Sequence, residues 1–290
     1  MTDNLAEYSR ECFEEERTSL IKRSVRDKEV CAVDRPHAVL LGGQSGAGKT
    51  TLHGIYDTKF NGNIIVINGD EYRSRHPHYR ELDAKYGVDA VSYTATWAGK
   101  MTEALIDALS VMQYNLVIEG TLRTSAVPLK TATLLKRRGY GVSLALMAVK
   151  PEISLISCQI RYEQMRIAGT IPRATDPAHH NKIIQDIVSN LDVLEKSEMF
   201  DDIRLFSRTG ACLFSRKGES AAGTGGHGGE SAAGVGGYDG GSAAAHAEQS
   251  ESERSASEAL RAILFGEWTT EEKMHYEFLQ KHLSDLKKKQ

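Results

Sequence analysis

The sequence predicts a three-layer α/β fold with a mostly parallel central sheet and C-terminal helices. Short apolar runs alternate with segments of helical periodicity along most of the chain, which is the pattern of βαβ units. A glycine-rich motif joins the first apolar run to the helical segment that follows it. Acidic residues end the next two apolar runs, at the strand ends where doubly wound sheets bind their ligands.

The glycine-rich motif is a complete G-x-x-x-x-G-K-[ST] sequence at residues 43–50. It follows a predicted strand at 38–41 and precedes a predicted helix that begins near Thr50, which is the context of a phosphate-binding loop rather than an ordinary glycine turn. Its glycines let backbone N–H groups curl around a phosphate, and the helix adds its positive N-terminal dipole. We therefore predict an ATP site formed by Gly43, Gln44, Ser45, Gly46, Ala47, Gly48, Lys49, Thr50 and Thr51.

Within this motif, the last two positions have separate roles. Lys49 can reach the β- and γ-phosphates as a mobile point charge, and the Thr50 hydroxyl is the expected ligand of Mg²⁺. The predicted cofactors are therefore ATP and Mg²⁺.

The remaining elements are predicted from periodicity and capping residues. Helices are expected at 5–25, 97–113, 129–138 and 183–194. Strands are expected at 64–67, 115–118, 142–149 and 203–206, the last being the final strand. Gly139 suits a helix C-cap, and Pro151 suits the first turn of a further helix. The polar, aromatic-rich segment 71–79 is expected to be a loop.

Two predicted strands end in an acid. Asp70 follows the strand at 64–67, which we expect to lie next to the phosphate loop, where an acceptor hydroxyl would meet the γ-phosphate. Glu119 closes the strand at 115–118, in the place where many phosphate-loop proteins carry the Walker B acid. For each acid the alternative is a solvated strand end with no functional role, but the presence of an acid at the end of both strands favours a functional role.

Arginines follow the fourth predicted strand. Arg161 lies on the helix that begins at Pro151, and Arg166 and Arg173 come after it. Guanidinium groups grip phosphate oxygens bidentately, so these residues suit a lid over a triphosphate. A solvated basic face explains the same spacing, and the sequence alone leaves both interpretations open.

Composition excludes several classes of function. The net charge of −3 provides no basic field for nucleic acid, and the longest apolar run, at 142–149, is too short to cross a membrane. No N/T-K-x-D or D-x-x-G motif of a nucleotide-switch GTPase occurs. Four scattered cysteines and the absence of a signal-peptide pattern lead us to expect a cytoplasmic protein with reduced thiols.

Composition changes abruptly near residue 217, where near-repeats of Gly-Glu-Ser-Ala-Ala-Gly begin. This stretch has too few bulky apolar residues to offset its ordering entropy. A charged amphipathic helix is expected afterwards at 270–288, with Thr269 or Thr270 as its N-cap. We therefore divide the chain into a phosphate-loop domain, a flexible Gly/Ala/Ser-rich insertion and a C-terminal helical segment of the same domain, at 1–216, 217–250 and 251–290.

Taken together, the segments resemble the zeta-toxin family of bacterial toxin–antitoxin systems, closest to its PezT branch. The resemblance runs almost continuously from Pro36 to about Arg208, and the glycine-rich insertion is foreign to it. Its motifs lie at 40–50, 69–79, 98–101, 115–124, 160–163, 173–175, 179–180 and 264–268.

The resemblance implies a P-loop kinase that phosphorylates the sugar 3′-hydroxyl of UDP-N-acetylglucosamine and so blocks cell-wall precursor synthesis. Asp70 would be the base, and Arg161 and Arg173 would act with Lys49 on the phosphates. A cognate antitoxin would be the partner. A P-loop kinase of another alcohol, such as an antibiotic or a sugar acid, is the closest alternative. The residues that would bind the acceptor are Asp70, Arg73, Glu103, Glu119, Thr121 and Arg123.

Overall fold

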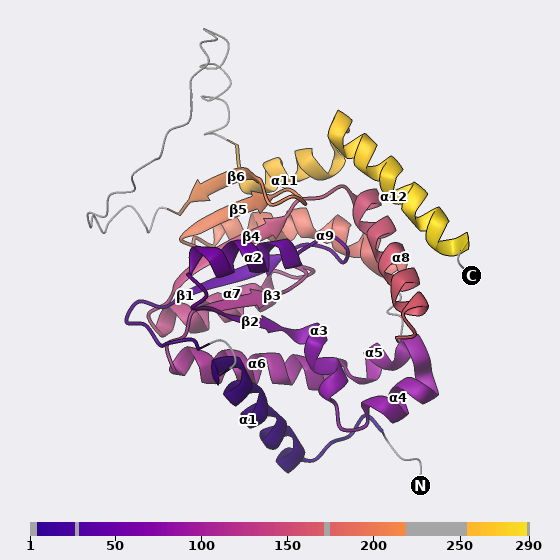
Figure 1. Ribbon diagram of the computed structural model, residues 1–290. Coiled ribbons are helices and arrows are strands. Elements are labelled where there is room, and N and C mark those ends of the chain that lie inside the picture. Colours follow the sequence, from indigo (N-terminus) through magenta and orange to yellow (C-terminus); the bar gives the residue numbers. More distant parts are fainter. Residues whose placement is uncertain (1–4, 27–28, 171–174, 219–253, 289–290) are drawn as a thin grey trace.

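The computed structural model describes residues 5–26, 29–170, 175–218 and 254–288 (Figure 1). Its centre is a six-stranded sheet with the strand order β2-β3-β1-β4-β5-β6. All neighbouring strands pair in parallel except β5 and β6. The predicted mostly parallel sheet is confirmed. The strands are β1 (His37–Gly42), β2 (Ile65–Asn68), β3 (Leu116–Glu119), β4 (Gly141–Met147), β5 (Asp202–Phe206) and β6 (Cys212–Lys217).

Two expectations about the sheet are wrong. The strand that precedes Asp70 is β2, which is separated from β1 and its phosphate loop by β3. Between β1 and β2 the chain passes the position that β3 fills, so these two consecutive strands are not neighbours in the sheet. The strand at 203–206 is also not the last, because β6 follows it antiparallel. The side chains of β6 are almost all exposed, so this edge strand has no buried apolar run to mark it.

Helices cover both faces of the sheet. They are α1 (Arg10–Arg26), α2 (Thr50–Lys59), α3 (Gly69–Tyr72), α4 (Tyr79–Tyr86), α5 (Ala90–Tyr93), α6 (Ala95–Val111), α7 (Ala126–Arg137), α8 (Pro151–Ile167), α9 (Pro177–Lys196), α11 (Ala256–Phe265) and α12 (Thr270–Lys288). Alternate residues of β1 enter two different cores. Ala38 and Leu40 face α1, α6, α7, α9 and α11, whereas Val39 and Leu41 face α2, α8 and α12. Three layers result, as predicted.

Helix ends follow from local residues. Ser9 accepts a hydrogen bond from the N–H of Cys12, so α1 begins later than the predicted residue 5. Thr269 and Glu272 form a reciprocal capping box before α12, which confirms one of the two predicted N-caps. Gly139, at φ 82°, ends α7 as predicted.

The segment 71–79, predicted to be a loop, is largely helical. It contains the end of α3, a 3-10 turn at Arg73–Arg75 and the start of α4. The buried Trp97 of α6 donates from Nε1 to the Tyr72 carbonyl over 3.0 Å. Such short helices are held by tertiary contacts, and they are too short to show a helical period in the sequence.

The C-terminal helices return to the body of the protein. Leu260 and Leu264 of α11 enter the first core, and Leu279 and Leu283 of α12 enter the second. Figure 1 shows α12 running along α8. The predicted insertion at 217–250 lies almost entirely outside the described residues, although Lys217 ends β6. Within the described ranges, no helix is both long and apolar enough to span a bilayer.

Candidate active site

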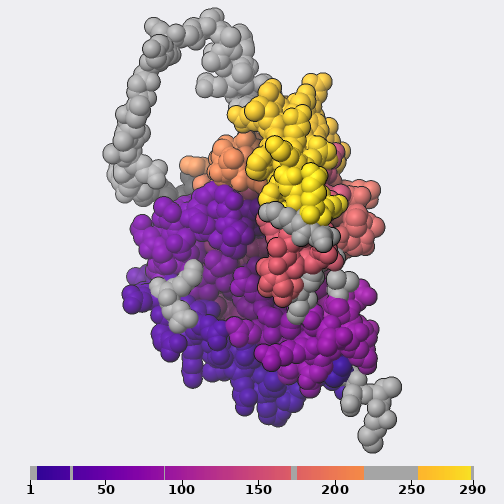
Figure 2. All heavy atoms as spheres, turned by 45° about the vertical axis from the view of Figure 1, so that its right-hand side comes forward, coloured from indigo at the N-terminus to yellow at the C-terminus, as the bar shows by residue number. Residues whose placement is uncertain are grey.

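The phosphate loop joins β1 to α2 and has a backbone that requires glycine. Gly43, Gly46 and Gly48 have φ values of 134°, 78° and 94°, a region that L-residues rarely adopt. A Cβ on Gly46 would lie 2.1 Å from the Ser154 carbonyl oxygen and 2.7 Å from Cys158 Sγ. The loop therefore rests directly on α8, the helix that also carries the predicted phosphate ligand Arg161. In the space-filling view, a recess lies between α8 and part of the N-terminal half of the chain (Figure 2).

Lys49 is folded back over its own loop. Its Nζ donates to the carbonyls of Gly43, over 2.9 Å, and of Gln44, over 3.3 Å. Burial lowers the pKa of Lys49, the charges of Glu119 and Asp70 act to raise it, and Arg161 acts to lower it. These predicted site residues therefore lie close enough to one another for their charges to interact.

Glu119 lies between two basic side chains. Its Oε1 is 3.8 Å from Lys49 Nζ, and its Oε2 is 2.9 Å from Nε2 of His53 on α2. The Glu119 side chain is only 15% exposed, so its charge is poorly screened by solvent. The sequence analysis missed His53. Its spacing of four residues from Lys49, one helical turn, is the signal that could have indicated it.

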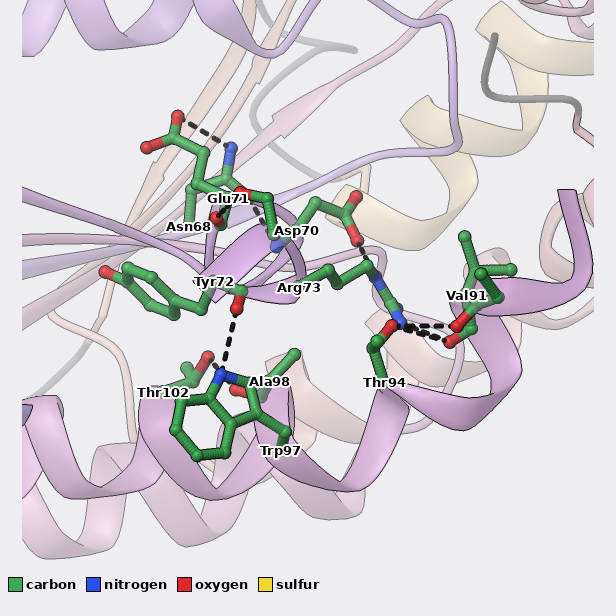
Figure 3. A network of polar contacts seen from close by, with 12 residues as sticks. Asn68, Asp70, Glu71, Tyr72, Arg73, Val91, Thr94, Trp97, Ala98 and Thr102 are labelled. Carbon is green, nitrogen blue, oxygen red and sulfur yellow. Dashed lines mark hydrogen bonds and ion pairs between the residues drawn. The ribbon is translucent and has the colours of Figure 1, made fainter. Parts of the chain in front are cut away.

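Asp70 lies in the first turn of α3, and Figure 3 shows the network around it. Its N–H donates to Asn68 Oδ1 over 3.1 Å, and its Oδ1 is 2.9 Å from Arg73 Nε. Arg73 Nη1 also donates to the Val91 carbonyl of α5, over 2.6 Å. The Asp70 side chain remains 65% exposed. The carboxylate is thus oriented by Arg73 while staying open to an incoming hydroxyl group.

The other predicted acceptor residues are spread more widely. Thr121 and Arg123 follow β3 on either side of Leu122, whose φ of 57° is strained for a leucine. Asn190 of α9 holds this turn by donating to the Leu122 carbonyl over 2.9 Å. Glu103, on α6, forms an exposed ion pair with Lys130 of α7.

Of the two arginines predicted to act on the phosphates, the structure describes only Arg161. Arg161 is exposed on α8, and its charge acts on Lys49. Arg173 lies outside the described residues. Arg208, in the turn after β5, was not predicted to be a site residue, because no motif surrounds it. Its Nη1 donates to the Gly46 carbonyl over 2.8 Å, and burial lowers the pKa of Arg208. It places a guanidinium group directly on the phosphate loop.

Oxygen ligands suited to Mg²⁺ surround the loop. Thr50 is exposed at the start of α2, and the Asp70 and Glu119 carboxylates lie within electrostatic range of the neighbouring Lys49. In the described part of the chain, no group of three or more His, Cys, Asp or Glu side chains could hold a metal. This donor set fits an ion that takes few protein ligands and completes its shell with phosphate and water.

Comparisons with known proteins identify relatives of this chain. The family model described as "Zeta toxin" matches residues 22–219. The toxin PezT of Streptococcus pneumoniae is 43% identical over 256 residues, which cover 88% of each chain. A toxin zeta of Streptococcus pyogenes is 38% identical over 213 residues, covering 73% of this chain and 74% of the relative. A solved structure of the PezAT chromosomal toxin–antitoxin system of Streptococcus pneumoniae is 37% identical, with a TM-score of 0.79 over 98% of this chain and 99% of that one.

Proposed function

The chain belongs to the zeta-toxin family, and from this premise we propose that it transfers the γ-phosphate of ATP to the 3′-hydroxyl of the sugar in UDP-N-acetylglucosamine. Its fold is the kinase-like fold of these toxins. The observation that supports phosphoryl transfer most strongly is the phosphate loop, with Lys49 beside Glu119 and in electrostatic range of Asp70 and Arg161. The choice of UDP-N-acetylglucosamine rests on the family resemblance.

In the proposed reaction, the protein positions two substrates and neutralises charge. Lys49 exchanges the carbonyls of Gly43 and Gln44 for phosphate oxygens and follows the γ-phosphate into the transition state. Thr50 would hold Mg²⁺, which when bound neutralises charge on the β- and γ-phosphates. Arg161 stabilises the charge spreading over the transferred phosphoryl group. Arg173 is proposed to share this role.

Asp70 is proposed as the general base. The 3′-hydroxyl gives its proton to the Asp70 carboxylate as its oxygen bonds to phosphorus and ADP leaves. Arg73 keeps one carboxylate oxygen oriented. Glu119, Thr121 and Arg123, at the end of β3, are proposed to bind the sugar nucleotide together with Arg73 and Glu103.

Such a reaction would remove a cell-wall precursor from use, which accounts for toxicity. Incubation with Mg²⁺, ATP and a panel of nucleotide sugars, antibiotics and sugar acids, followed by mass spectrometry, tests the proposal. We expect phosphorylated UDP-N-acetylglucosamine from the wild type and nearly none from a folded Lys49→Ala variant. Transfer only to another alcohol would favour the alternative acceptor. Activity of Lys49→Ala within about tenfold of wild type would contradict the role of the phosphate loop.

We also propose that an antitoxin inhibits this protein. The solved PezAT structure, which is 37% identical to this chain, is that of a toxin–antitoxin system. A small helical partner that obstructs the ATP site should compete with ATP. Co-expression with the neighbouring open reading frame should relieve toxicity and yield a complex on a sizing column. Failure of both would count against this partner.

A further inference from the structure

A chain of buried polar groups joins the phosphate loop to two helices. Gln44, the second residue of the loop, donates from Nε2 to the Val149 carbonyl over 2.8 Å and to Ser154 Oγ over 3.2 Å. Ser154 Oγ, in the first turn of α8, is 2.8 Å from Nε2 of His180 on α9. The side chains of Gln44, Ser154 and His180 are all fully buried, at 0% exposure. Of these three hydrogen-bonded residues, only Gln44 belongs to the proposed active site.

Counting protons gives the direction of the hydrogen bonds that Gln44 makes. The Gln44 amide must turn its nitrogen toward Val149, because its oxygen would face another oxygen there. Ser154 Oγ, which lies 2.8 Å from the Pro151 carbonyl oxygen, accepts from Gln44 Nε2. The direction of the contact with His180 Nε2 depends on the histidine tautomer: a ring protonated at Nε2 donates to Ser154 Oγ, and a ring protonated at Nδ1, which lies 3.4 Å from Asn181 Oδ1, accepts at Nε2. Burial lowers the pKa of His180, which favours the neutral ring, and in both tautomers His180 Nε2 is the last partner in this series of hydrogen bonds.

The position of Gln44 determines the shape of the loop. The Gln44 carbonyl accepts from the Ala47 N–H, over 3.2 Å, and from Lys49 Nζ. The Gln44 Oε1 atom is buried and has no hydrogen-bond partner among the described residues, so only the two Nε2 bonds hold the side-chain amide. Loss of the Ser154 contact would leave a single bond and free the amide to rotate.

We propose that His180 is a positioning residue for the nucleotide: through Ser154 it orients the buried amide of Gln44 and so preorganises the phosphate loop. This inference rests on the proposed function only in taking ATP as the ligand of the loop. His180 itself lies behind α8 and touches neither phosphate nor acceptor. Its contribution is a loop already shaped for phosphate, which lowers the ordering cost of binding.

The test measures binding of a non-hydrolysable ATP analogue with Mg²⁺ by calorimetry, with thermal unfolding and kinase assays in parallel. We expect His180→Ala to weaken binding by about tenfold, the equivalent of one buried hydrogen bond. His180→Gln, whose side-chain amide can either donate to Ser154 Oγ or accept from it, should recover most of the affinity. His179→Ala removes the exposed neighbouring histidine and should change nothing.

A double-mutant cycle separates positioning from packing. If His180 acts through Ser154, then Ser154→Ala combined with His180→Ala should lose little more affinity than either change alone. Wild-type affinity in a folded His180→Ala protein would overturn the inference, as would a stable His180→Gln protein that binds as weakly as His180→Ala. If His180→Ala does not fold, His180→Gln and Ser154→Ala decide the matter on the same criteria. A wild-type protein that binds no ATP analogue would instead contradict the proposed function.

Discussion

Asp70 is the residue on which the proposed chemistry depends most directly. Its carboxylate is largely exposed and is oriented by Arg73. Asp70→Asn keeps the shape and can still accept from Arg73, but it cannot take a proton. We therefore expect kcat to fall roughly 10²–10⁴-fold, the usual range for a positioned acid or base, with little change in KM. Steady-state kinetics with both substrates varied measures this.

A small effect of Asp70→Asn on kcat would change the role assigned to Asp70. If Asp70→Asn keeps most of its kcat and only weakens Mg²⁺ or acceptor binding, Asp70 is an anchor rather than a base. The proton would then pass to Glu119 or Glu103. Glu119 is the stronger of these two candidates on position, because it lies beside Lys49, whereas Glu103 is paired with Lys130 at the surface.

Single residues were predictable where a motif or a strand end identified them. As predicted, the phosphate loop joins β1 to α2, Glu119 ends β3 and Asp70 follows β2. Arg208 and His180 could not be predicted to approach the loop, because one follows β5 and the other lies on α9. Their contacts with Gly46 and Ser154 depend on how distant segments pack. Strand order, which separates Asp70 from the loop by one strand, is likewise a property of the assembled sheet.

At the scale of the elements, the contact between the phosphate loop and α8 leaves no room for a larger side chain. Gly46→Ala would drive a methyl group into the Ser154 carbonyl at a backbone angle that alanine rarely adopts. We expect ATP-analogue affinity to fall more than about tenfold, because the loop must shift to relieve the clash. Calorimetry measures the affinity, and thermal unfolding measures the stability of the variant.

Gly54→Ala is the matched control in the adjoining helix. A Cβ on Gly54 would meet nothing within 4 Å, and alanine is favoured over glycine in a helix by about 1 kcal/mol. This variant should bind normally and unfold at the same or a higher temperature. Equal behaviour of the two variants would show that the loop does not depend on its contact with α8.

Long helices and buried strands were predictable, whereas short helices and an exposed edge strand were not. Helices α6, α8, α9 and α12 have enough turns to show an apolar stripe, and β1 and β4 are buried runs. The short helices α3 and α5 and the exposed edge strand β6 carry no such pattern. They form because Trp97, Arg73 and the neighbouring strand β5 supply partners from elsewhere in the chain.

At the scale of the whole molecule, one carboxylate joins the segments on either side of residues 219–253. Glu195 Oε1 accepts from Arg216 Nη1 at the end of β6, over 2.7 Å, and from the N–H of Ala256 at the start of α11, over 2.9 Å. These two ends therefore meet at the same point of α9, and a short connection can join them.

Replacing residues 219–248 by a short Gly-Ser link should leave melting temperature and activity nearly unchanged. Loop-closure entropy depends only logarithmically on length, so a shorter loop changes stability little. Calorimetric unfolding and the kinase assay check this. A large loss of either would show that the replaced segment folds or binds something. Glu195→Gln in the shortened protein provides a control, because it weakens the anchor without altering the link.

The packing of α12 also determines how late in translation the core beneath the phosphate loop is completed. Translation supplies the phosphate loop, Asp70 and Glu119 early, but the core beneath that loop still lacks Leu279, Leu283 and Leu286 of α12. Because α12 packs along α8, on which the loop rests, we expect the loop to reach its final form only after residues 270–288 have been made and have packed. Nucleotide binding by a chain that ends at residue 253 would contradict that conclusion.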